Sequence, residues 1–232
     1  MKKIKENQII FWSKDSVKTK SMTLSAMSLS FYTIFAFIGN TYFPLPIFGN
    51  FLNLDISLVF LIPLAFMCSV KWWFTSAFLS GFFNFLWAGA GGWIGAIFNV
   101  MVNVFTLFVF WGLKKLIIKN NKEKLLKIKI ALVIFISTII CILFNCVING
   151  ILFTPLYWWS YQIGPASFIE MEKIYNSTES LHGYLLFIPK YWPAIFATYG
   201  SFNLLKFGLV GILLFPLIII MYKSKIIYRY WK

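Results

Sequence analysis

An ammonium group and several amide side chains stand within apolar stretches of this 232-residue chain. Lys206 lies about nine residues into the last apolar segment, roughly 13 Å from its near end if the segment is helical. Asn203 precedes Lys206 by three residues, so both side chains lie on one helix face. Asn149 stands at the end of another apolar segment. Because polar groups at membrane depth are costly and usually functional, these three residues could converge on one outward-facing pocket.

The sequence gives Lys206 no acidic partner at its own depth, because no Asp or Glu lies within an apolar segment. A lone ammonium there needs water, backbone carbonyls or a ligand acceptor, unless the side chain reaches the nearest interface. Asparagines also occur at Asn84, Asn99 and Asn103. Hydrogen bonds between helices are an alternative explanation for each asparagine, and they suffice for Asn84 and Asn103.

Residue sets typical of catalysis or metal binding are absent from the sequence. His182 is the single histidine, and no H-E-x-x-H, G-x-S-x-G or nucleotide-binding P-loop motif occurs. Cys68, Cys141 and Cys146 lie in apolar runs without metal or redox spacing, which predicts buried free thiols. We therefore expect no enzyme, no metal site and no cofactor.

Composition places these residues in a membrane protein. Hydrophobic residues make up 60% of the chain and charged residues 12%, against about 25% charged in soluble domains. This excludes a soluble enzyme and a disordered chain. A membrane-spanning helix needs about 20 apolar residues, and the sequence predicts a single all-α membrane domain, 1–232, with six spans. The predicted spans are 21–39, 56–70, 74–88, 93–113, 130–152 and 197–222, of which the second and third are short.

The net charge of +14 predicts the orientation of these spans. Of the 21 basic residues, 18 lie in the arm 1–20, at Lys71, in the connection 114–129 or in the tail from Lys223. With six spans all of these segments share one side, and basic residues collect in cytoplasmic loops. We therefore expect both termini to be cytoplasmic in the cell membrane. Anionic lipid accounts for the lysines, so nucleic acid is not an expected partner.

Two further segments bear on partners and access. The predicted external loop 153–196 is rich in proline, tryptophan and tyrosine, which could line the membrane interface or form a lid over a cavity. The first span carries small residues, among them Ser25, Ala26 and Ser30. Small residues four apart allow close approach of another helix, either within the bundle or from a partner subunit.

Four short motifs support a family resemblance. They are Phe51–Ser57 with Asp55, Gly91–Asn99, Asn149 followed by Pro155-Leu156-Tyr157, and Phe202-Asn203-Leu204-Leu205-Lys206. In these motifs and in its layout the chain resembles the S component, the substrate-binding subunit, of energy-coupling factor (ECF) vitamin transporters, and particularly the riboflavin-specific branch. Ala96 and Phe83 depart from the pattern, in which an acid and a lysine are expected near these positions.

The resemblance implies a subunit that binds riboflavin or a related flavin from outside, with six helices, a membrane coupling partner and two separate ATPase subunits. It implies ligand contacts by Asp55, Asn99, Asn149, Tyr157, Asn203 and Lys206. Amides and an ammonium match the pyrimidine edge of a flavin, and aromatic walls suit its flat ring. Two alternatives stay open: an S component for another flat vitamin or nucleobase, and a membrane-embedded enzyme or assembly factor.

Overall fold

The computed structural model describes residues 14–48, 52–83, 92–118 and 123–223, which fold as helices joined by short connections. The long helices are α1 (Lys14–Tyr42), α4 (Gly92–Ile117), α5 (Glu123–Ile148) and α9 (Tyr191–Lys223). Four helical stretches are long and apolar enough to cross a membrane: Lys18–Tyr42, Gly92–Ile117, Leu125–Ser160 and Tyr191–Lys223. The chain is therefore an all-α membrane protein.

Two shorter helices complete the bundle. α2 (Leu58–Met67) has 10 residues and α3 (Val70–Phe82) has 13, so α2 rises only about 15 Å and α3 about 20 Å. Neither reaches the roughly 30 Å of a hydrocarbon core by itself. A non-helical segment, residues 52–57, leads into α2, and nearly all of α2 is buried. The apolar sequence of α2 thus reflects burial among the other helices.

The segment predicted as an external loop is mostly helical. A π-helical turn, η3 (Asn149–Phe153), continues α5 into α6 (Thr154–Ser160), followed by α7 (Phe168–Ser177) and α8 (Glu179–His182). We refer to residues 154–190 as the cap. The cap has its own small core, in which Trp158, Met171 and Tyr175 pack with Tyr191 at the start of α9.

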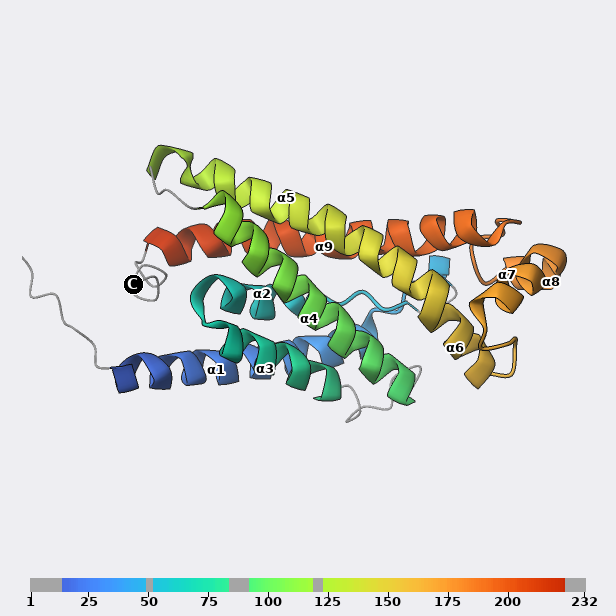
Figure 1. Cartoon of the computed structure of the whole chain (residues 1–232), viewed down its shortest axis with the longest axis horizontal. Helices are drawn as coiled ribbons and strands as arrows, with labels where there is room; N and C mark the ends of the chain where they lie inside the picture. The colour runs from blue at the N-terminus through green and yellow to red at the C-terminus, as the bar shows by residue number, and fades with distance from the viewer. Residues whose placement is uncertain (1–13, 49–51, 84–91, 119–122, 224–232) are drawn as a thin grey trace, which may run out of the picture.

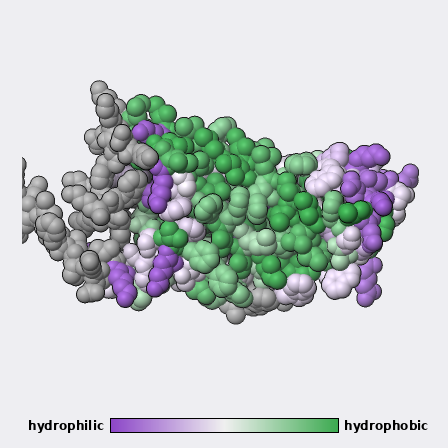
Figure 2. All heavy atoms as spheres, in the orientation of Figure 1, coloured by the Kyte–Doolittle hydropathy of each residue, from purple (hydrophilic) through white to green (hydrophobic). Residues whose placement is uncertain are grey.

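The cap lies at one end of the helix bundle (Figure 1). The start of α1, the end of α4, the start of α5 and the last residues of α9 lie at the opposite end. A hydrophobic band covers the surface between two more hydrophilic ends (Figure 2), as expected of a protein that lies across a bilayer. We call these the cap end and the opposite end.

Helix packing follows the apolar faces of the segments. The main core contains side chains from α1, α2, α3, α4, α5 and α9. Its largest buried side chains include Trp73, Phe66, Phe110 and Phe207. α3 packs along α4, and α5 packs along α9. Cys68, Cys141 and Cys146 are free and buried, which confirms the prediction from their apolar surroundings.

Helices of the structure extend beyond the predicted spans at several ends. α1 begins at Lys14 instead of near Ser21, and α9 begins at Tyr191 instead of near Ala197. Hydropathy marks the part of a helix that is apolar, whereas the backbone hydrogen bonds continue into the polar flanks. Most of the basic arm 1–20, Asn84, the glycine turn before Gly92 and the tail after Lys223 lie outside the described residues.

Candidate functional site

A cavity of about 360 Å³ lies at the cap end, walled by α1, the 52–55 segment, α4, α5, the cap and α9. This volume is typical of small-molecule sites. All six binding residues predicted from the sequence line it, although they come from five separate parts of the chain. These residues are Asp55, Asn99, Asn149, Tyr157, Asn203 and Lys206.

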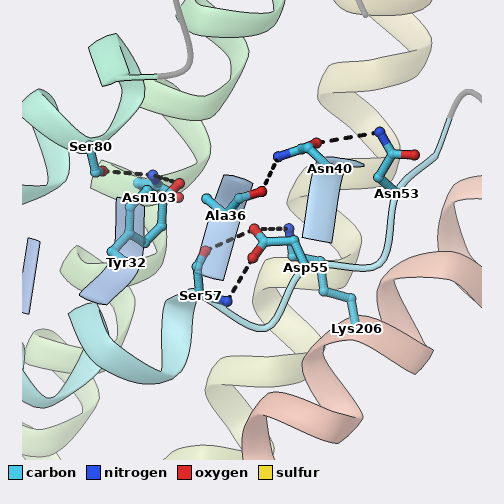
Figure 3. A network of polar contacts seen from close by, with 9 residues as sticks. All are labelled: Tyr32, Ala36, Asn40, Asn53, Asp55, Ser57, Ser80, Asn103 and Lys206. Carbon is cyan, nitrogen blue, oxygen red and sulfur yellow. Dashed lines mark hydrogen bonds and ion pairs between the residues drawn. The ribbon is translucent and has the colours of Figure 1, made fainter. Parts of the chain in front are cut away.

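Lys206 has an acidic partner, which corrects the expectation of a lone ammonium. Its Nζ lies 3.4 Å from Oδ2 of Asp55, and the side chains are 17% and 10% exposed, respectively. Asp55 belongs to the connection between the first two predicted spans, and the resemblance implied a ligand contact for it but no pairing with Lys206. The non-helical 52–57 segment instead brings its carboxylate against α9 (Figure 3). The two charges compensate each other, so the ammonium does not depend on a ligand.

Local geometry holds Asp55 in this position. Its Oδ1 accepts a hydrogen bond from the Ser57 backbone N–H at 2.7 Å, and its Oδ2 accepts one from the Ser57 hydroxyl at 2.8 Å. A carboxylate beside the first turn of α2 also complements the positive end of the helix dipole. Gly39 of α1 lets the segment approach, since a Cβ there would lie 2.8 Å from the Leu54 carbonyl and 3.0 Å from Asp55 Cα.

Asn149 and Asn203 are anchored by their own helices. Nδ2 of Asn149 donates to the Asn145 carbonyl at 2.8 Å, and Nδ2 of Asn203 donates to the Tyr199 carbonyl at 2.7 Å. Each amide can form further hydrogen bonds with its second N–H and its oxygen. Asn149 opens the π-helical turn η3, a distortion that is frequent at functional sites. These two amides, with the Lys206 ammonium, give the cavity donors and acceptors in fixed positions.

A second polar cluster connects the cavity wall to neighbouring helices (Figure 3). Nδ2 of Asn103 donates to the Tyr32 hydroxyl at 2.9 Å and to the Ser80 hydroxyl at 2.8 Å. This joins α4 to α1 and α3, which confirms the interpretation of Asn103 as a residue that links helices. Elsewhere in the cavity wall, Nδ2 of Asn53 donates to Asn40 Oδ1 at 3.4 Å.

Aromatic side chains form much of the remaining wall. Phe98 contacts Phe153 with their ring centroids 4.7 Å apart, and Trp158 contacts Tyr184 with centroids 5.6 Å apart. The Tyr199 hydroxyl lies 2.8 Å from Thr154 Oγ1, which ties α9 to the start of the cap. An interior of this kind suits a flat ring system with a polar edge.

The cavity wall also contains polar and aromatic residues outside the set predicted from the sequence. Asn40, Asn53, Asn145, Tyr32, Tyr184 and Tyr199 all line the cavity and were not predicted to do so. Spacing could have identified two of them, because Asn145 lies one helical turn before Asn149 and Tyr199 one turn before Asn203. No local sequence pattern indicates that Asn40, Asn53 or Tyr184 line the cavity. The tertiary fold brings these residues to its wall.

The small residues of α1 divide between two faces. Ser25 is buried within the bundle, whereas Ala26 and Ser30 are exposed. The Ser30 hydroxyl donates to the Ala26 carbonyl at 3.0 Å, so it is satisfied within the helix. Only the Ala26–Ser30 pair therefore remains available to a partner helix.

His182 has a structural environment within the cap. Its Nε2 lies 3.0 Å from the Tyr175 carbonyl, and its ring packs on the Tyr175 ring with centroids 5.0 Å apart. Burial raises the pKa of Tyr175 to about 12, so its hydroxyl stays protonated and donates to the Ile188 carbonyl at 2.7 Å. Within the described residues no three His, Cys, Asp or Glu side chains gather as a metal site would require.

Comparison with known proteins places the whole chain in a family. It is 33% identical over 228 residues to the uncharacterized protein MG350.1 homolog of Mycoplasma pneumoniae, covering 97% of this chain and 96% of the relative. It is 31% identical over 208 residues to the uncharacterized protein MG350.1 of Mycoplasma genitalium, covering 88% and 89%. No protein-family model and no solved structure matches the chain. The chain belongs to the family that contains these two mycoplasma proteins.

Proposed function

We propose that the chain is the substrate-binding subunit of an ECF-type importer and takes up riboflavin or a related flavin from the outside. One observation carries the proposal: Asn149, Asn203 and Lys206 meet in a single cavity that also has aromatic walls. These residues come from two separate parts of the chain, the start of η3 and the middle of α9. A cavity of about 360 Å³ offers space of the order that small-molecule ligands occupy.

The chemistry of a flavin matches this wall. Its isoalloxazine ring is flat and largely apolar, and side chains such as Phe98, Trp158 and Phe202 supply apolar surface. Its pyrimidine edge alternates carbonyl acceptors with an N–H, and the amides of Asn149 and Asn203 can offer both donors and an acceptor. The Lys206 ammonium can donate to a carbonyl or ring nitrogen while it remains near Asp55.

The proposal includes six spans with both termini cytoplasmic in the cell membrane. Its support is that the cavity and the cap occupy one end of the bundle, while the start of α1 and the last residues of α9 occupy the other (Figure 1). Lys18, Lys20 and Lys223 belong to those helix ends. In this arrangement α2, with its 52–57 entry segment, and α3 supply the second and third spans, and the cavity opens outward.

Transport would require partner subunits, because the described residues contain no nucleotide-binding motif. We propose a membrane coupling subunit and two ATPase subunits, with the exposed Ala26–Ser30 pair of α1 as the docking position. Ala26→Leu would place a bulky side chain there and should abolish co-purification with the coupling subunit. Ser25→Ala, on the buried side of the same helix, is the matched control. Co-purification that survives Ala26→Leu would disprove docking at this pair.

The first test is the absorption spectrum of the gently purified protein, because a bound flavin colours the protein yellow. Protein without bound ligand is then titrated with riboflavin, and quenching of flavin fluorescence measures the dissociation constant. A colourless protein that quenches no added flavin would overturn the flavin assignment. The same protein would then be titrated with other flat vitamins and nucleobases.

A further inference from the structure

The wall of the cavity is almost free of ionisable charge. Among the described lining residues, Lys206 is the one basic side chain and Asp55 the one acidic side chain. Residues 49–51 and 84–91, which precede the lining residues Leu52 and Gly92, contain no Lys, Arg, His, Asp or Glu in the sequence. The positive charge available to a ligand is therefore that of Lys206.

Asp55 already compensates that charge. Its Oδ2 lies 3.4 Å from the Lys206 ammonium, and both of its oxygens accept hydrogen bonds from Ser57 at 2.7–2.8 Å. The carboxylate is thus fixed beside the lysine by its own chain segment. Taken together, the two side chains give the cavity wall a formal charge of zero.

The cap adds no positive excess at the outer end. α7 and α8 carry Glu170, Glu172 and Glu179 against Lys173, and Lys190 follows before α9. None of these charged residues lines the cavity, and with His182 neutral they give the cap a net negative formal charge. An anionic group therefore meets no excess of positive charge, whether it faces Lys206 or the cap.

The N-terminus of α4 is the strongest competing feature, since Gly92 and Gly95 line the cavity. A helix N-terminus attracts an anion with only a fraction of a unit charge. Removing an ion from water costs far more than this attraction returns, even after relaxation of its surroundings. The helix dipole is thus too weak to offset the missing counter-charge.

We propose that the cavity accepts an uncharged flavin and rejects its phosphate monoester. This selectivity rests on the flavin binding proposed above. A phosphate monoester carries a charge of about −1.5 to −2 at pH 7, and sites that bind one supply Arg or Lys donors for it. Asp55 is the residue that sets the selectivity, because it removes the excess charge that Lys206 would otherwise offer.

The test compares riboflavin with riboflavin 5′-phosphate, which differs only by the phosphate, in fluorescence titrations at pH 7 and fixed ionic strength. We expect the phosphate to bind at least about 30-fold more weakly, equivalent to about 2 kcal/mol. An uncharged 5′-ester of similar size should bind within about threefold of riboflavin, which corresponds to less than about 0.7 kcal/mol. An ester as weak as the phosphate would overturn the proposal, because size would then explain the discrimination.

Two variants locate the effect. Asp55→Asn leaves the Lys206 charge uncompensated and should narrow the ratio of the two dissociation constants if the phosphate faces Lys206. Tyr161→Lys adds a cation to the cap side of the wall and should narrow it if the phosphate faces the cap. Tyr42→Lys, at a 68% exposed tyrosine outside the cavity wall, adds the same charge and should leave the ratio unchanged. If neither Asp55→Asn nor Tyr161→Lys narrows the ratio of the two dissociation constants, the charge mechanism is overturned.

The outcomes separate this proposal from the one it rests on. Equal affinities for riboflavin and its phosphate would overturn the selectivity and leave flavin binding intact. Failure of both compounds to bind would overturn both proposals.

Discussion

Lys206 and Lys114 are both lysines on apolar helices, yet their ammonium groups find different partners at different ends of the bundle. Lys206 lies in the cavity wall at the cap end and pairs with a carboxylate on a non-helical segment. Lys114 is 8% exposed, and its Nζ donates to the carbonyls of Phe66 and Ala65 at 2.9 and 3.4 Å, at the end of α2. The first is within reach of a ligand, whereas the second satisfies the end of a helix.

The comparison distinguishes a polar group that is available for ligand binding, Lys206, from one that stabilises the fold, Lys114. At the end of α2 the Leu64 carbonyl accepts a hydrogen bond from the Cys68 N–H, and the carbonyls of Ala65 and Phe66 accept hydrogen bonds from Lys114. A cation there also complements the helix dipole. The Lys206 pair instead borders open space, so a ligand can add hydrogen bonds to it. Burial alone does not distinguish the two lysines, but the presence of a cavity does.

The largest effect is expected from Lys206→Ala. Loss of the ammonium removes a charged donor from the cavity and leaves Asp55 without its counter-charge, so flavin affinity should fall by more than about tenfold. Fluorescence quenching titrations measure the change, and Lys114→Met is the matched control, expected to bind flavin within about twofold of wild type. Unchanged affinity in Lys206→Ala would remove the ammonium from the proposed binding chemistry.

Lys114→Met should instead lower stability. Methionine keeps an unbranched stem but has no donor, so the hydrogen bonds from the ammonium to the carbonyls of Ala65 and Phe66 are lost, at a cost of about 1–3 kcal/mol. Thermal unfolding in detergent, followed by tryptophan fluorescence, measures this loss. The control is Lys115→Met: Lys115 is exposed and lies over the Trp111 ring at 4.0 Å, a contact worth about 0.5–1 kcal/mol at such sites. Equal stabilities of the two variants would contradict a special role for Lys114.

The environments of these two lysines also show which structural features the sequence could predict. Hydropathy located the four long helices, and helical spacing placed Asn203 and Lys206 on one face, because both depend on neighbours along the chain. The partner of Lys206 is 151 residues away, and no periodicity connects it to α9. Lys114 was counted with the lysines of the 114–129 connection, because only the packing of α4 against the end of α2 reveals its burial.

The cap illustrates the same limit. Its prolines and aromatic residues indicated either an interfacial belt or a lid, and the sequence could not decide between them. In the structure Trp158, Tyr161 and Tyr184 line the cavity, whereas Trp159 is 53% exposed. Composition therefore indicated that aromatic residues of this segment could line a cavity. The turns between its short helices determine which of them do so.

A smaller effect should follow from Gly39→Ala. The added methyl would lie 2.8 Å from the Leu54 carbonyl, so the 54–55 segment must move away from α1 and carry Asp55 with it. We expect flavin affinity to fall by about threefold, less than on loss of the ammonium itself. The control is Gly208→Ala on α9, where a Cβ would have no neighbour within 4 Å, and affinity should not change. Equal affinities of the two variants would show that Asp55 does not need this close approach.

The smallest effect on flavin affinity should come from Tyr199 and Thr154, a hydroxyl pair at the cap end that, like Lys114, stabilises the fold. Their oxygens lie 2.8 Å apart, and the pair joins α9 to the start of the cap. Tyr199→Phe or Thr154→Val alone should cost about 1 kcal/mol of stability, because one buried hydroxyl loses its partner. The double variant should lose little more stability than either single variant, since it leaves no unpaired hydroxyl.

A double-mutant cycle by thermal unfolding measures this coupling between Tyr199 and Thr154. The flavin affinities of the same variants should stay within about twofold of wild type. Strictly additive losses would mean that the two hydroxyls act independently, and a large loss of affinity would move Tyr199 from the structural group to the binding group.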